Sequence, residues 1–386
     1  MNTSCLNKCF SLFLLRSLVI LALLEACSPL EEEVPATPTV MTPGMTTKVS
    51  DTSMPDIAVT PNATPTARIF RDGICNPDES KGHIFFLRGN STGNRNHASY
   101  YDLYVMDGNG CFPRLVLPEA SGSPAWSPDG NQLAIGCANN GFLCILDIKK
   151  TLDTCSGGQR DVGQCSAAIL RRFALPSDIG GDERMYNISW SSDGSQIATE
   201  GGSATTSERS IYILTLAGEG VWEILMRGQG AFNIAWSPID DQLALSGLVF
   251  INLKSDHVRG ANGLYPAWSP DGKKIAFVTI SLDQNKEPYG IAAINLASGN
   301  LSWLYEPIPR DDKYYFPPNN LVIRDDGRYH RLLCWSPDSQ YMAFTAEYGL
   351  GSMSHIFRLD IKTGEIVNLT AKIKEGEAFY APAWGP

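Results

Sequence analysis

The stretch SPAWSPDGNQLAIG, residues 123–136, contains an apolar run that ends on a Trp, a Pro-Asp-Gly turn, and a second apolar run. Pro fixes its own φ, Gly accepts a left-handed backbone, and an Asp side chain can hydrogen-bond the backbone two residues further on. The stretch therefore predicts a strand, a tight turn and a second strand.

This phrase recurs along the chain, and six of the eight Trp residues occupy the same place in it. The copies are ISWSSDGSQIATE (188–200), IAWSPIDDQLALS (234–246), PAWSPDGKKIAFV (266–278), LCWSPDSQYMAFT (333–345) and the fragment PAWGP (382–386). Successive repeat Trp residues lie 64, 46, 32, 67 and 49 residues apart, a variable spacing around the length of a propeller blade. Because each interval holds three further short β-like runs, one repeat predicts one four-stranded antiparallel sheet.

The repeat resembles that of the TolB-type six-bladed β-propeller, a WD40-like repeat with the form A-W-S-P-D-G-x-x-I-A-F followed by a strand such as I-Y-V-M-D. The second part is matched by YVMD (104–107), IYIL (211–214) and IFRLD (356–360). The resemblance covers residues 80 to 386 and implies an all-β fold of six four-stranded antiparallel blades. Three turns depart from the repeat and are expected to be looser: Ser192 replaces Pro, Ile239-Asp240 replace Asp-Gly, and Ser339 replaces Gly.

The first and last blades of this region are each incomplete in the sequence. The first strands, at 83–88, 101–107 and 113–118, have no Trp strand before them, while FYAPAWGP (379–386) has nothing after it. Joining them predicts that the C-terminal strand becomes the innermost strand of the first blade and closes the ring. The alternative is that residues 69–80 supply this strand and the C-terminus begins a seventh blade.

The N-terminus predicts export and anchoring. Residues 1–26 carry Lys8, Arg16 and a short apolar run, which is typical of a signal peptide and too short to span a membrane. Leu24-Glu25-Ala26-Cys27 resembles the bacterial lipobox, although Glu25 departs from its usual residue, and this implies lipidation at Cys27. Residues 27–68 are rich in Pro, Thr and Ser and predict a disordered tether to the propeller at 69–386. We expect an exported protein, lipid-anchored to a bacterial membrane; the alternative is a secreted protein cleaved nearby.

An exported chain can form disulfides. Cys155 and Cys165 bracket one loop, Cys137 and Cys144 lie on two arms of a hairpin, and both pairs are candidate bridges, while Cys334 is expected to be a buried thiol. No C-x-x-C spacing occurs and the five His are scattered, so we expect neither a metal site nor a cofactor.

Four acids recur at one turn position: Asp129, Asp193, Asp271 and Asp338. We expect them to be structural, because an active-site acid would occur only once.

Residues 305–331 are the longest connection on the face opposite these turns. They carry candidate partner-binding residues: Tyr314, Tyr315, Phe316, Arg328 and His330. A recognition loop and a self-packed loop over the channel remain equally open.

The leading hypothesis is a monomeric, non-enzymatic lipoprotein of the cell envelope that binds or scaffolds a protein, peptide or glycan through one propeller face. A net charge of −10 without a basic cluster argues against nucleic acid. The alternative is a propeller hydrolase or lyase acting on a saccharide or peptide. No G-x-S-x-G motif is present and the six inner runs before the Trp contain no acid, which argues against that alternative.

Overall fold

The computed structural model separates into two units, residues 1–54 and 55–386, and every residue that it describes lies in the second. The described residues are 70–72, 82–90, 101–137, 142–154, 168–176, 184–202, 208–229, 232–247, 249–252, 258–259, 263–279, 290–306, 321–323, 332–348, 353–371, 373 and 377–386. The predicted signal peptide, Cys27 and the tether therefore lie outside the described residues.

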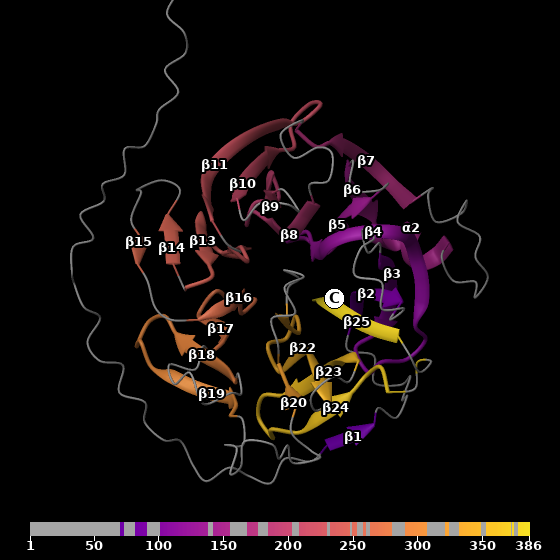
Figure 1. The fold of residues 1–386 in the computed structure, drawn as a ribbon, viewed down its shortest axis with the longest axis vertical. Coiled ribbons are helices and arrows are strands. Elements are labelled where there is room, and N and C mark those ends of the chain that lie inside the picture. The colour runs from indigo at the N-terminus through magenta and orange to yellow at the C-terminus, as the bar shows by residue number, and fades with distance from the viewer. Residues whose placement is uncertain are drawn as a thin grey trace, which may run out of the picture. The chain divides into compact units, whose positions relative to one another are not determined.

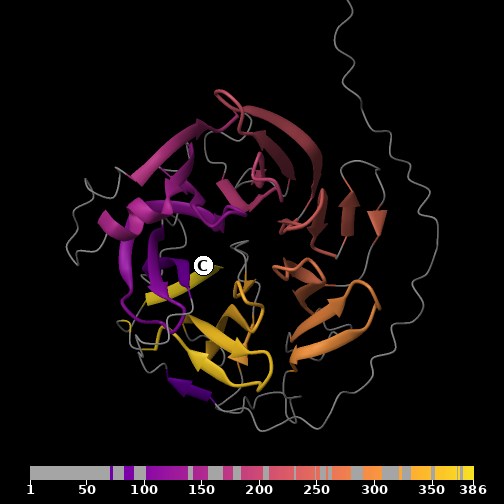
Figure 2. The ribbon, with the colours of Figure 1, turned by 180° about the vertical axis from the view of Figure 1, so that it is seen from behind.

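Groups of antiparallel strands surround a common centre, as two opposite views show (Figures 1 and 2). We number these groups as blades in chain order and give the strands of each from the centre outward. Blade 1 contains β25 (Glu377–Gly385), β2 (His83–Asn90), β3 (Tyr101–Asp107) and the first part of β4 (Arg114–Trp126). Blade 2 contains the second part of β4, β5 (Gln132–Cys137), β6 (Phe142–Asp147) and β7 (Ile169–Ala174). Blade 3 contains β8 (Arg184–Trp190), β9 (Gln196–Gly202), β10 (Glu208–Thr215) and β11 (Val221–Gln229).

The remaining blades follow the same pattern. Blade 4 contains β12 (Ala235–Trp236), β13 (Gln242–Leu245), β14 (Val249–Asn252) and β15 (Val258–Arg259). Blade 5 contains β16 (Leu264–Trp268), β17 (Lys274–Val278), β18 (Ile291–Asn295) and β19 (Leu301–Tyr305). Blade 6 contains β21 (Leu333–Trp335), β22 (Tyr341–Tyr348), β23 (Ser354–Asp360) and β24 (Ile366–Asn368), with β20 (Leu321–Val322) also paired to β22. The helix α2 (Ile148–Thr154) follows β6.

The C-terminal strand β25 pairs antiparallel with β2, and Trp384 lies opposite Ile84 in the register. This is the pairing that the sequence predicts for FYAPAWGP. The alternative source of the strand is wrong, because β1 (Phe70–Asp72) instead pairs parallel with β24 at the outer edge of blade 6.

The hydrophobic core lies between neighbouring blades rather than within one sheet. Six clusters of buried apolar side chains occur among the described residues, and each contains or packs against one repeat Trp. The cluster with Trp384, for example, joins Ile84 of β2 to Ala343 of β22 and Ile356 of β23. The repeat Trp residues therefore act as wedges between blades, since a large aromatic side chain buries substantial area there.

One face of the domain, which we call the turn face, carries two kinds of turn. One kind is the repeat turn between the first and second strands, and the other joins the third strand to the fourth. Backbone hydrogen bonds of 2.9 Å join the two kinds within a blade, from Ile148 N to Asn131 O and from Leu216 N to Ser195 O, among others. Ser339 adopts a φ of 59°, close to the 71° of Gly130, and its N donates to Ser336 O at 2.9 Å. The expected loosening of this turn is therefore wrong: the turn keeps its shape with a non-Gly residue in the left-handed region.

Candidate functional site

Each repeat turn is held by a Ser and an Asp. Ser127 Oγ donates to Asp129 Oδ1 at 2.5 Å, and Asn131 N donates to the same oxygen at 3.1 Å. Equivalent bonds hold Asp193, Asp271 and Asp338. The Ser hydroxyl and the backbone amide lower the pKa of Asp129, Asp193 and Asp271 below the ordinary range. These residues are structural, as their recurrence predicts, and they also leave exposed carboxylates on the turn face.

Four of the repeat indoles connect one blade to its neighbour. Trp190 Nε1 donates to Ala125 O at 3.0 Å, so the acceptor is the residue just before the repeat Trp of the preceding blade. The same bond runs from Trp268 to Ala235, from Trp335 to Ala267 and from Trp126 to Ala383. These bonds hold the repeat Trp residues around one centre.

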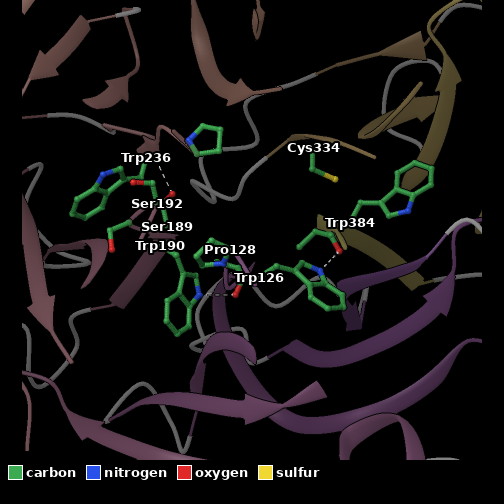
Figure 3. A pocket seen from close by; sticks show the side chains of 12 residues that line it. Trp126, Pro128, Ser189, Trp190, Ser192, Trp236, Cys334 and Trp384 are labelled. Atoms are coloured by element: carbon green, nitrogen blue, oxygen red, sulfur yellow. Dashed lines mark hydrogen bonds between the residues drawn. The ribbon is translucent and has the colours of Figure 1, made fainter. Parts of the chain in front are cut away.

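A cavity of about 190 Å³ lies at this centre, at the end of the inner strands where the repeat turns begin (Figure 3). Residues from blades 1, 2, 3, 4 and 6 line it. Its apolar wall includes Ala125, Pro128, Pro238 and Ala383, and Ser189 and Ser192 lie on the side of blade 3.

The polar side of the cavity lies where the repeat is irregular. Ser189 stands where the other repeats have Ala or Cys before the Trp, and Ser192 stands where they have Pro. Ser189 Oγ accepts a hydrogen bond from Trp236 N at 2.8 Å. Trp236 Nε1 is buried and finds no hydrogen-bond partner among the described residues, unlike the indoles of the regular boundaries. The departure from the repeat therefore changes the packing between blades 3 and 4 and places hydroxyl groups beside the cavity.

A second polar feature is a row of buried side chains three residues before the repeat Trp. This position carries Ser or Asn in blades 2, 3 and 4 and Tyr, Leu or Ala in the others; the residues in blade order 2 to 6 and then 1 are Ser123, Asn187, Asn233, Tyr265, Leu332 and Ala381. Ser123 Oγ donates to Asn187 Oδ1 at 3.2 Å, and Asn187 Nδ2 donates to Asn233 Oδ1 at 3.0 Å. These buried bonds tie three successive blades together.

Glu200, at the far end of β9, anchors this network. Its side chain is fully buried, and Asn233 N donates to Glu200 Oε2 at 3.1 Å. Arg209 Nε lies 3.9 Å from the other carboxylate oxygen, and the guanidinium lies over the Tyr186 ring. Burial raises the pKa of Glu200, because desolvation penalises the charged form more than its hydrogen bonds favour it. Glu200 can therefore hold a proton, although it has no contact with solvent.

Glu200 is not among the residues expected from the sequence, because a functional acid was expected only on the inner strands. Glu200 lies on a second strand and reaches inward from there. A signal was present in the sequence QIATEGG (196–202), where a charged residue interrupts the apolar run of a buried strand.

Of the other predicted residues, Cys137 and Cys144 form a disulfide that joins β5 to β6, which confirms this bridge. Cys111 is also disulfide-bonded, and Cys334 is a buried thiol beside the cavity. Cys155 and Cys165 lie outside the described residues, as do all five candidate partner-binding residues: Tyr314, Tyr315, Phe316, Arg328 and His330.

Within the described ranges, no group of three or more His, Cys, Asp and Glu side chains could hold a metal ion. The same ranges contain no helix that is long and apolar enough to cross a membrane.

Comparisons with known proteins show the fold alone. No protein-family model matches the sequence, and no curated protein matches it. Among solved structures, TolB from Acinetobacter baumannii is similar with a TM-score of 0.52 and 17% identity, over 79% of this chain and 67% of that one. An oligogalacturonate lyase in complex with manganese has a TM-score of 0.43 and 14% identity, over 76% of each chain. The fold is therefore a β-propeller similar to that of TolB, as the repeat predicts.

Proposed function

We propose that this chain is a non-enzymatic binding protein of the bacterial cell envelope, in which one face of the propeller recognises a protein, peptide or glycan. The observation that carries the proposal is the cavity at the centre of the turn face, where five blades converge on one concave surface. Concave surfaces that combine apolar walls with a few polar groups are common binding sites. The resemblance to the TolB-type repeat supports an envelope role through analogy of fold.

We infer that the blades form a closed six-bladed ring with β25 as the innermost strand of blade 1. The pairing of β25 with β2 supports this, and so does the hydrogen bond from Trp126 Nε1 to Ala383 O. Arg88 of β2 adds support, because it pairs with Glu377 of β25 and its Nη1 donates to Tyr104 OH at 2.7 Å. Such a ring leaves only short outer edges for unwanted strand pairing.

The anchoring proposal rests on the N-terminal sequence. Cleavage before Cys27 and acylation of its thiol would leave the propeller on a Pro- and Thr-rich tether at a membrane surface. A single acyl chain binds a membrane only marginally, so stable retention requires more than one.

Fractionation of cells tests the anchor. The wild-type chain should stay with the membrane until detergent is added, and Cys27→Ser should be found in the soluble fraction or remain unprocessed. Cys9→Ser, which changes a Cys inside the signal, is the matched control and should behave as wild type. Normal processing and retention of Cys27→Ser would refute the anchor.

Capture from envelope extract tests the binding function. The tagged full-length chain in a non-ionic detergent should retain a defined envelope component through washing, in amounts comparable to its own. Retention of no component by the folded protein would count against the proposal. The enzyme alternative gains no support from Glu200, since its carboxyl is enclosed by protein and cannot reach a substrate.

A further inference from the structure

Resting on the binding function proposed above, we propose that the cavity of the turn face is a docking site for a cationic segment of a partner protein, which inserts one bulky apolar side chain into it. This assigns both a face and a partner chemistry.

The size of the cavity indicates a single side chain. At about 190 Å³ it is smaller than the roughly 300–1,000 Å³ typical of sites for free small molecules. Its wall contains Pro128, Pro238, Ala125 and Ala383, which offer carbon rather than strong polar groups. A bulky side chain held by a partner's backbone fits such a recess, as the buried anchors of protein interfaces do.

Three of the four repeat Trp residues that line the cavity are poorly placed to stack on a sugar. Trp190, Trp236 and Trp384 retain only 7%, 4% and 6% of their exposure, because their rings are wedged between blades. Figure 3 shows these three indoles pointing in different directions around the cavity rather than forming one platform. The glycan option of the proposed function is therefore less favoured at this site than a peptide segment.

The charge around the cavity indicates a cationic partner. The six residues that follow each complete repeat Trp contain six acids, Asp129, Asp193, Asp240, Asp241, Asp271 and Asp338. Against them stand two bases, Lys273 and Lys274, which leaves a net charge of −4 in the repeat turns of the turn face. Charges of one sign around a concave site attract the opposite sign and repel an anionic membrane surface.

Exposed apolar side chains lie on the same face. Phe112 and Ile239 are the most exposed large apolar residues within the described ranges, at 63% and 61%. Ile239 follows Pro238 of the cavity wall, in the position where other repeats have Asp, and its side chain covers Gly272 of the next blade. Phe112, in the turn after β3, holds a φ of 54°. Both give a partner apolar contacts outside the recess.

A titration with defined peptides tests the proposal. The full-length protein in a non-ionic detergent is titrated with acetyl-Lys-Lys-Phe-Lys-Lys-amide by calorimetry. We call this the Phe-Lys peptide. Two peptides serve as controls: in the Ala-Lys peptide, Ala replaces Phe, and in the Glu peptide, Glu replaces every Lys. We expect the Phe-Lys peptide to bind about tenfold more tightly than either control. Its affinity should also fall when salt is raised from about 20 to about 300 mM, since salt screens exposed charges.

Variants then locate the binding. Ser192→Trp places a large side chain in the cavity and should weaken binding by about tenfold. Ala297→Trp adds the same side chain to an exposed turn of blade 5 on the same face and should bind as wild type. Asp129→Asn with Asp338→Asn keeps the Oδ1 acceptor of both turns while removing two charges, and should weaken binding of the peptides that carry Lys.

The outcomes separate this inference from the proposed function. Equal binding of the three peptides, or binding that Ser192→Trp leaves unchanged, overturns the docking site. If the Glu peptide binds as tightly as the Phe-Lys peptide, the proposal that the partner segment is cationic is overturned. If an envelope component remains captured by folded Ser192→Trp, the proposed function stands while the turn-face site fails.

Discussion

Gly385 lies against the Trp126 indole, and replacing it by Ala tests how β25 packs on blade 2. A Cβ at residue 385 would lie 2.2 Å from two ring carbons of Trp126. The indole cannot move freely, because its Nε1 donates to Ala383 O at 3.1 Å. Overpacking costs about 1–3 kcal/mol and a lost hydrogen bond about 1 kcal/mol, so Gly385→Ala should lower the free energy of unfolding by about 2–4 kcal/mol.

The assay is urea unfolding of the full-length chain, followed by circular dichroism. The control is a double-mutant cycle with Trp126→Ala, which removes the indole that the new Cβ would meet. In that background Gly385→Ala should cost no more than about 0.5 kcal/mol. If Gly385→Ala lowers the free energy of unfolding equally in both backgrounds, the proposed clash is wrong, since it would then not involve Trp126, 259 residues away in the sequence.

Three further predictions concern the disulfide, the buried acid and the aromatic loop. Cys137→Ser with Cys144→Ser should lower the unfolding free energy by about 2.5 kcal/mol, the chain-entropy value for so short a loop; an unchanged urea midpoint would contradict this. Burial raises the pKa of Glu200 above its ordinary value of 4.5, so the folded state keeps a proton that the unfolded chain releases, and stability should fall as the pH rises above 4.5. Glu200→Gln should flatten this dependence above pH 4.5 in thermal melts, and an identical slope in variant and wild type would count against it. Tyr314→Ala with Tyr315→Ala should leave Phe-Lys peptide binding unchanged if the turn face is the site, whereas a loss of about 2 kcal/mol in calorimetry would favour the recognition-loop hypothesis.

The repeated elements could be predicted from sequence because their causes are local. Ser127, Asp129 and Gly130 fix a turn within a few residues, and the apolar runs on either side fix the strands that it joins. The pairing of β25 with β2 followed from counting strands, although its residues are far apart in the chain.

The remaining features depend on contacts between distant residues. Nothing near Phe70 indicates that β1 adds to β24. A charged residue in the apolar run of β9 indicates Glu200, but not that Asn233 of the next blade donates to it. The sequence indicates the cavity only in part: Ser192 departs from the repeat, but its consequence depends on how blades 3 and 4 pack. Departures from a repeat thus indicate irregular positions, whereas the geometry of the site depends on contacts between blades.

Site-specific photo-crosslinking in cells tests the central claim, that this propeller binds an envelope component through its turn face. A benzophenone side chain is placed at Pro128, exposed at the cavity rim, and separately at Met353, at the start of β23 on the opposite face. The probe at Pro128 should crosslink to one envelope protein, the probe at Met353 should not, and the crosslink at Pro128 should disappear in Ser192→Trp. Crosslinking of that protein from Met353 alone, or an unchanged crosslink at Pro128 in Ser192→Trp, would contradict this claim.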